Sequence, residues 1–142
     1  MPAERPAIGS LRFFTDRNLG SRTVPNLLRA AGWNVVTMNE FYGPQSGESV
    51  DDVVWVREAT ERGFILLCAD AAMAAVPLEA RTIKMCSARV FAISRKNAQL
   101  RGTEQGVLFL RHQSQITQLA LREGPYSFAV TRSGLREQKL LG

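Results

Sequence analysis

Short apolar runs alternate with segments of helical periodicity along most of the chain. The runs read as strands because they are brief, rich in Phe, Val, Ile and Leu, and bounded by polar residues or glycine. They cover Leu11–Thr15, Trp33–Thr37, Phe64–Cys68 and Arg89–Ser94. Apolar positions at helical spacing predict helices over Val24–Ala31, Asp51–Arg62 and 104–122, with a short helix in AAMAAV that Pro77 ends. Thr23 and Thr103 are the expected N-caps, and Gly32 the expected residue after the first helix.

The order of these segments predicts an α/β fold. A strand–helix–strand opening favours parallel pairing, so we expect a mostly parallel sheet with helices on both faces. Tyr126–Thr131 and Leu135–Leu140, joined at Ser133-Gly134, predict a C-terminal edge hairpin, whereas Met38–Val50 reads as a long exposed loop. The length of 142 residues suits a single domain over 1–142, with 1–10 as a flexible N-terminus.

Composition narrows the chemistry. One histidine and two cysteines without a CxxC motif leave little material for a zinc site or a serine triad. No apolar stretch approaches the roughly 20 residues of a membrane span, which indicates a cytoplasmic protein with no membrane contact. Residues 1–78 carry 7 Lys/Arg and 9 Asp/Glu, while residues 79–142 carry 11 and 4. An acidic half joined to a basic half suits an enzyme that binds a metal with one part and a polyanion with the other, although a solvated basic surface would look the same.

Three aspartates fall where the predicted topology could bring them together. Asp16 and Asp70 each follow a strand, and Asp52 opens the helix that leads to the second of these strands. Each also has a structural explanation: Asp16 and Asp70 could cap turns or helices, and Asp52 with Ser49 fits a capping box. Helical phase places Asp52 on the stripe that faces the sheet and Asp51 toward solvent. If the three carboxylates meet, they suit Mg²⁺ or Mn²⁺ and the hydrolysis of a phosphodiester.

The order FFTD, VDDVVW and GFILLCAD resembles the PIN-like ribonuclease domains, and most closely the compact VapC-type toxins of bacterial VapBC toxin–antitoxin pairs. The resemblance covers about residues 11–131. It implies a three-layer fold and a metal-dependent endoribonuclease with Asp16, Asp52 and Asp70 as catalytic and metal-binding residues. It further implies an RNA substrate, inhibition by an antitoxin protein, and a homodimer.

The sequence departs from the family pattern at two points. Cys68 stands where the family often has Thr or Ser two residues before its last Asp. A further acidic residue of classical PIN domains has only Glu40 and Glu48 as candidates. These departures keep open an alternative function, a catalytically inactive PIN-like domain that binds RNA or a protein. A receiver domain is a weaker alternative, because the acidic pair expected near its first strand is missing.

Four residues are candidates for holding the substrate. Arg95 and Lys96 follow a strand and could bind RNA phosphates at the same edge as the aspartates, or belong to a solvated loop. Arg17 and Asn18 follow Asp16 and could orient a phosphate, although Asn18 could equally form a turn.

Overall fold

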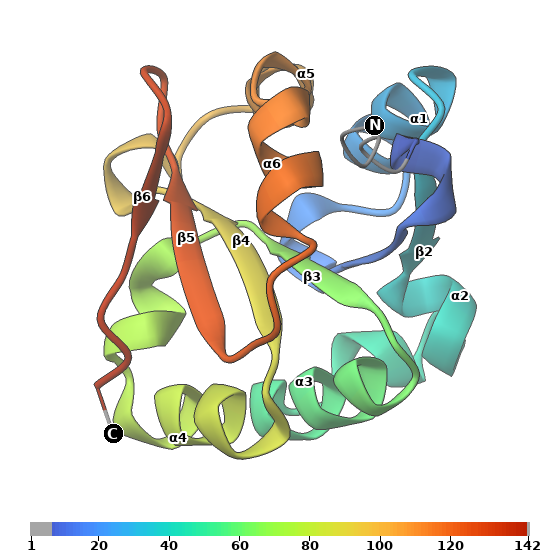
Figure 1. Cartoon of the computed structure of the whole chain (residues 1–142). Helices are drawn as coiled ribbons and strands as arrows, with labels where there is room; N and C mark the ends of the chain where they lie inside the picture. The colour runs from blue at the N-terminus through green and yellow to red at the C-terminus, as the bar shows by residue number, and fades with distance from the viewer. Residues whose placement is uncertain (1–6, 142) are drawn as a thin grey trace.

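The computed structural model describes residues 7–141, apart from the side chain of Glu48. One six-stranded sheet with the order β2-β1-β3-β4-β5-β6 forms the middle layer (Figure 1). Its strands are β1 (Arg12–Thr15), β2 (Asn34–Thr37), β3 (Ile65–Cys68), β4 (Arg89–Ile93), β5 (Tyr126–Val130) and β6 (Leu135–Glu137). The first five strands run parallel, and β6 pairs antiparallel with β5. The predicted mostly parallel sheet and its C-terminal edge hairpin are confirmed.

Helices cover both faces of the sheet (Figure 1). One face carries α1 (Thr23–Ala30), α5 (Gly102–Arg111) and α6 (Gln113–Leu119), and the other carries α2 (Met38–Tyr42), α3 (Asp52–Glu61) and α4 (Pro77–Cys86). Short 3₁₀ turns connect the elements: η1 (Ile8–Ser10), η2 (Arg17–Leu19), η3 (Ser46–Glu48), η4 (Ala71–Ala75) and η5 (Arg95–Asn97). The result is the three-layer α/β fold that the sequence predicts.

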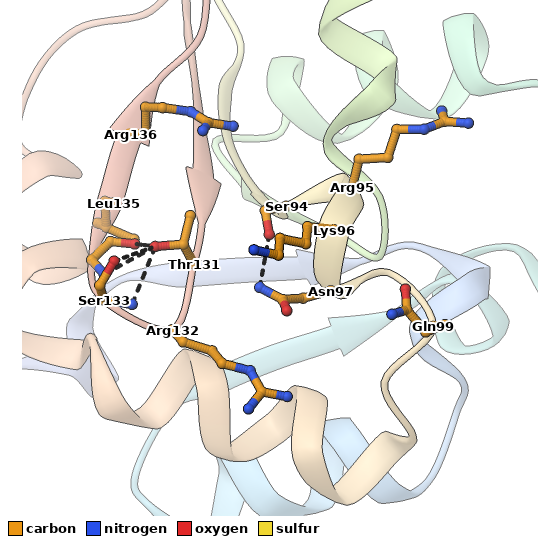
Figure 2. A pocket seen from close by; sticks show the side chains of 11 residues that line it. Ser94, Arg95, Lys96, Asn97, Gln99, Thr131, Arg132, Ser133, Leu135 and Arg136 are labelled. Atoms are coloured by element: carbon orange, nitrogen blue, oxygen red, sulfur yellow. Dashed lines mark hydrogen bonds between the residues drawn. The ribbon is translucent and has the colours of Figure 1, made fainter.

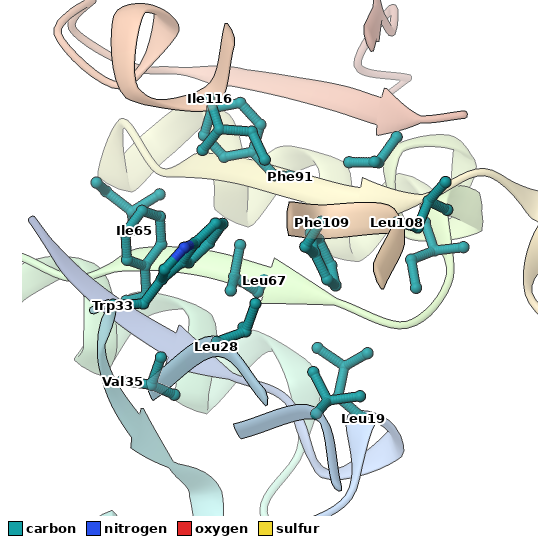
Figure 3. Packing of buried hydrophobic residues seen from close by; sticks show 14 of the residues in the cluster. Leu19, Leu28, Trp33, Val35, Ile65, Leu67, Phe91, Leu108, Phe109 and Ile116 are labelled. Carbon is teal, nitrogen blue, oxygen red and sulfur yellow. The ribbon is translucent and has the colours of Figure 1, made fainter. Parts of the chain in front are cut away.

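Two apolar clusters fill the spaces between the layers. Phe13 and Phe14 are neighbours on β1, and because successive strand residues point to opposite faces, each belongs to a different cluster. Figure 3 shows the cluster under α1, α5 and α6, where Leu28, Trp33 and Phe109 lie against the sheet. On the other face Phe14 stacks on Trp55 of α3, with ring centroids 5.6 Å apart. All four residues of β3 are buried, which explains its unbroken apolar run.

The predicted helices agree only in part with the structure. The expected loop Met38–Val50 begins with α2, where Thr37 and Glu40 form a capping box. The segment AAMAAV forms the predicted short helix, the 3₁₀ helix η4, which ends before Pro77, but Pro77 also begins α4, which was not predicted. Proline is favoured in the first turn of a helix because its missing N–H has no partner there. The expected helix over 104–122 is divided at His112 into α5 and α6.

The predicted caps are also partly wrong. The N-cap positions of α1 and α5 are Arg22 and Arg101, so Thr23 and Thr103 lie inside their helices. Gly32 follows α1 with φ +92°, as expected for a glycine that ends a helix. Residues 1–6 of the predicted flexible N-terminus lie outside the described residues, while Ile8 packs against the first cluster.

The strand order creates a switch point between β1 and β3. From β1 the chain passes through α1 on one face to β2, whereas β3 continues into α4 on the opposite face (Figure 1). When the connections after two neighbouring strands pass to opposite faces of a sheet, a crevice forms at the carboxyl ends of these strands. Ligands of open α/β sheets bind in such crevices. The topology therefore points to the ends of β1 and β3, where Asp16 and Asp70 lie.

Candidate active site

Asp16 is a buried carboxylate that joins the ends of β1 and β3. Its Oδ1 accepts hydrogen bonds from the backbone N–H groups of Asn18 (2.7 Å) and Leu19 (3.1 Å), and its Oδ2 accepts one from Ala69 N–H (3.1 Å). The pKa of Asp16 is raised to about 6, because burial and, to a smaller extent, the charge of Asp52 outweigh the lowering effect of these three bonds. Asp16 is the N-cap of η2, and it is also a buried acid held in one orientation.

Asp52 occupies the first turn of α3 and is half-buried. The N-cap position belongs to Asp51, and the Oδ1 of Asp52 accepts a hydrogen bond from the indole Nε1–H of Trp55 at 2.8 Å. The alternative explanation of Asp52 as part of a capping box with Ser49 is therefore wrong. Trp55, Val56 and Ala59 are all fully buried, which confirms that this stripe faces the sheet. Asp51 is exposed, so the choice of Asp52 by helical phase agrees with the structure.

Asp70 lies two residues beyond β3 and caps the following turn. Its Oδ1 accepts a hydrogen bond from Ala72 N–H at 2.9 Å. Cys68, two residues earlier, is fully buried, and burial together with the charges of Asp16 and Asp52 raises its thiol pKa well above the usual value. Cys68 is consequently a neutral thiol at physiological pH. It lacks the hydroxyl group of the Thr or Ser that PIN-like domains often have at this position.

Two of the three predicted carboxylates interact electrostatically in the structure. The charge of Asp52 acts on Asp16, and both charges act on Cys68 at the end of β3. Within the described part of the chain, no three Asp, Glu, His or Cys side chains are close enough to enclose an ion. Asp70 therefore does not form a three-carboxylate group with Asp16 and Asp52 in this conformation, and its role as a ligand stays a prediction.

Residues near Asp16 have structural contacts of their own. The Arg17 guanidinium donates to the carbonyl oxygens of Gly47 (3.1 Å) and Val50 and so fixes the loop before α3. Asn18 donates its backbone N–H to Asp16. Glu40 bonds to Thr37 N–H and to Arg29; burial raises its pKa, but these contacts outweigh burial and the net shift is downward. Glu40 is thus occupied in the α1–α2 contact, and the Glu48 side chain lies outside the described residues.

Arg95 and Lys96 form η5 directly after β4, the strand next to β3. Both side chains are exposed and line a cavity of about 950 Å³ between η5 and the turn that joins β5 to β6 (Figure 2). Because β3 and β4 are parallel neighbours, η5 lies at the same sheet edge as Asp70. Arg95 and Lys96 therefore lie at the same sheet edge as Asp16, but two strands away from it, because β3 separates β4 from β1.

Comparison with known proteins agrees with this arrangement. The model of the PIN-like domain family matches residues 11–95, which span Asp16, Asp52 and Asp70. The chain belongs to the PIN-like domain family. A protein of Mycobacterium tuberculosis (strain ATCC 25618 / H37Rv) that is named "Putative ribonuclease VapC45" is 32% identical over 131 residues, which cover 92% of this chain and 94% of that protein. No solved structure matches the chain.

In this PIN-like domain Glu79 is an acidic residue that the sequence analysis overlooked. It lies in the first turn of α4, and its Oε2 is buried without a hydrogen-bond donor. Burial raises the Glu79 pKa, and contact with the Asp52 carboxylate raises it further. An acid two residues after Pro77 resembles an ordinary helix-start residue, and α4 itself was not predicted, so no signal in the sequence connected Glu79 with Asp52.

We expect Glu79→Gln to raise the melting temperature of the metal-free protein at pH 7. The substitution removes the like-charge contact with Asp52 and lets the side chain donate a hydrogen bond. Because the pKa of Glu79 is raised in the folded state, the gain should be complete above that raised pKa, shrink as the pH falls toward the ordinary glutamate value of 4.5, and be lost below it. Thermal melts in a chelator at pH 4 and pH 7 measure this, with the exposed Glu123→Gln as the control. An equal shift at both pH values would contradict the contact.

The described helices of the PIN-like domain include none that is both long enough and apolar enough to cross a membrane.

Proposed function

We propose that this PIN-like domain is an endoribonuclease that hydrolyses RNA phosphodiester bonds with Mg²⁺ or Mn²⁺, acting as the toxin of a cytoplasmic type II toxin–antitoxin pair. The observation that carries the proposal is the electrostatic interaction of Asp16, at the end of β1 beside the β1–β3 switch point, with Asp52. Support for RNA as the substrate comes from the ribonuclease name of a relative that matches almost the whole chain. We propose that residues 1–142 act as one domain.

The residues present fit a hard divalent cation. The donors at the switch point are carboxylate oxygens, which Mg²⁺ and Mn²⁺ prefer. The buried Oε2 of Glu79 lacks a hydrogen-bond donor, and burial together with the charge of Asp52 raises the pKa of Asp16, an effect that a bound cation would offset. We propose Asp16, Asp52 and Asp70 as the ligands, with Glu79 as an additional acid beside Asp52. A bound ion would activate water and stabilise the charge that develops on the phosphate.

The chain's own residues would orient the reacting groups. Three backbone N–H groups hold Asp16 in place, and Trp55 fixes the half-buried Asp52. Both carboxylates are therefore preorganised, which reduces the cost of arranging them during the reaction. We propose that Arg95 and Lys96 bind phosphates of the RNA. We also propose that Arg17 and Asn18 contact the RNA beside Asp16.

We propose a cognate antitoxin protein and a second copy of the chain as partners. The exposed apolar side chains of Leu78 and Met85 on α4 support a protein contact, because they are 62% and 80% exposed. Light scattering of the purified chain, alone and with the product of a neighbouring antitoxin-like gene, tests this. A monomer that binds no such product would contradict both partners.

RNA cleavage should require a divalent ion. We expect the purified protein to cut single-stranded RNA with Mn²⁺, and to lose activity in excess chelator because the buried acids then lack their counter-charge. Gel analysis of end-labelled RNA measures cleavage, and calorimetric titration with Mn²⁺ measures binding. Refilling the chelated protein with Mn²⁺ should restore cleavage, which controls for damage by the chelator.

A catalytically inactive PIN-like domain is the second candidate function. It is favoured by the neutral Cys68 in place of a hydroxyl group and by the absence, among the described residues, of three acidic side chains close enough to hold an ion. RNA binding without heat release from Mn²⁺ and without cleavage would support this alternative. Cleavage that depends on Mn²⁺ would exclude it.

A further inference from the structure

The β5–β6 turn forms the second wall of the cavity beside η5. Arg132 and Arg136 come from this turn and from β6, and they face Lys96 across the hollow. Figure 2 shows the Lys96 side chain directed toward the turn, with Arg136 and Arg132 on either side of it, whereas Arg95 extends the other way from η5. Two segments distant in the sequence thus bring cationic groups to one cavity.

The cavity has a strong excess of positive charge. Its lining contains four cationic residues and no Asp or Glu, and the ion pairs found among residues 7–141 involve none of the four. Like charges around one hollow repel each other, and this repulsion is relieved when an anion binds. The cavity is therefore suited to a ligand with several negative charges.

Fixed polar groups hold the two walls in place. Asn97 is buried and donates its Nδ2–H to Ser94 Oγ at 2.9 Å, which fixes η5. On the other wall Thr131 Oγ1 accepts hydrogen bonds from Ser133 N–H (3.3 Å) and Gly134 N–H (3.1 Å). The backbone positions from which the cationic side chains extend are consequently set before a ligand arrives.

The lining also indicates which part of a nucleic acid would bind. It contains no aromatic side chain on which a base could stack, and Leu135 is its only large apolar residue. A peptide would usually need buried apolar anchors, which this cavity offers poorly. Arginine, lysine and hydroxyl groups instead match phosphate oxygens, and contacts with phosphates carry no sequence information.

The cavity and the candidate active site lie along the same edge of the sheet. Asp16 follows β1, Asp70 follows β3, Arg95 follows β4 and Arg132 follows β5, and these four strands are adjacent and parallel. Neighbouring strands lie about 5 Å apart, so β1 and β5 are about 15 Å apart, a span of a few nucleotides.

We infer that this cavity, bounded by Lys96, Arg132 and Arg136, is a phosphate-backbone site that holds the RNA strand to one side of the scissile phosphate. It binds the strand without regard to base sequence. The identification of its ligand as the substrate strand rests on the proposed function, but the binding of phosphates rests on the cavity alone.

The test measures binding without cleavage. Fluorescence anisotropy of two labelled single-stranded 12-mers, one all uridine and one of mixed sequence, is recorded in chelator at several salt concentrations. The proteins are the wild type, the double variant Arg132→Gln/Arg136→Gln, and the charge-matched control Arg57→Gln/Arg22→Gln, whose side chains are exposed on α3 and before α1.

We expect the cavity variant to bind both RNAs about tenfold more weakly. The slope of log K (association constant) against log salt should become less steep by about 1.4, since each lost phosphate contact removes about 0.7. The control should keep the wild-type affinity and slope. Equal binding of the RNAs by the cavity variant and the control variant would overturn the inference. Wild-type protein that binds RNA through this cavity but never cleaves it would refute the nuclease function and leave the site in place.

Discussion

Asp70→Asn and Asp52→Asn should each lower the rate of RNA cleavage by at least about 100-fold, a typical loss when a group that stabilises developing charge is removed. Asparagine keeps an oxygen that can accept the hydrogen bonds from Ala72 N–H and from Trp55 Nε1–H, so the local structure should persist. Only the negative charge is removed. Single-turnover cleavage of labelled RNA with Mn²⁺ measures the rate.

The matched control for this experiment is Asp51→Asn. Asp51 is adjacent to Asp52 in the chain but exposed, and its side chain makes no capping bond. We expect its cleavage rate to stay within about twofold of the wild type, since surface changes away from a site have small effects. Equal rates for Asp51→Asn, Asp52→Asn and Asp70→Asn would refute the proposed site. A loss with Asp52→Asn alone would limit the site to Asp52 and its neighbours.

Asp16 should make the metal-free protein less stable as the pH rises from 4 to 7. Its pKa is about 6 in the folded state and 3.8 as an ordinary value, so the folded state binds more protons in this interval. The stabilisation that Asp16 provides is complete below the ordinary pKa and is lost as the pH passes through 6. At about 1.4 kcal/mol per pKa unit, this change amounts to about 2 to 3 kcal/mol.

Asp16→Asn should remove this dependence. Its free energy of unfolding relative to the wild type should therefore rise by about 2 to 3 kcal/mol between pH 4 and pH 7. Asparagine cannot accept from all three N–H groups at once, because one of its terminal atoms is a donor. The prediction therefore concerns the change with pH rather than the value at one pH. Urea unfolding in chelator measures it, and a constant difference across the interval would contradict the buried charge.

The raised pKa of Asp16 and the contact between Asp52 and Glu79 have the same origin. Acidic groups gather here, and neither Arg17, which bonds to the loop carbonyls, nor Arg29, which bonds to Glu40, is paired with them. A cation at this point would relieve both effects at once. Stability that increases with Mn²⁺ in the wild type and less in Asp16→Asn is the expected consequence.

The strands were predictable from the sequence, while several helices were not. A strand buried on both faces must be apolar throughout, so β3 and β4 were visible as runs. α2 has only five residues, and its Thr37–Glu40 capping box was hidden beside a glycine-rich stretch. A proline can either begin a helix or follow the end of one, so Pro77 alone does not show which of the two applies. The packing of α4 against α3 decides that Pro77 begins a helix.

The sequence by itself determined the family pattern, the positions of Asp16 and Asp70 at strand ends, and the choice of Asp52 over Asp51, because these follow from local spacing along strands and helices. Only the tertiary structure brought Glu79 to Asp52 and placed Arg132 and Arg136 opposite Lys96. Such contacts depend on strand order and on how α4 and the β5–β6 turn pack. Residues that meet from distant segments leave no periodic signal in the chain, so their chemistry is fixed by the fold.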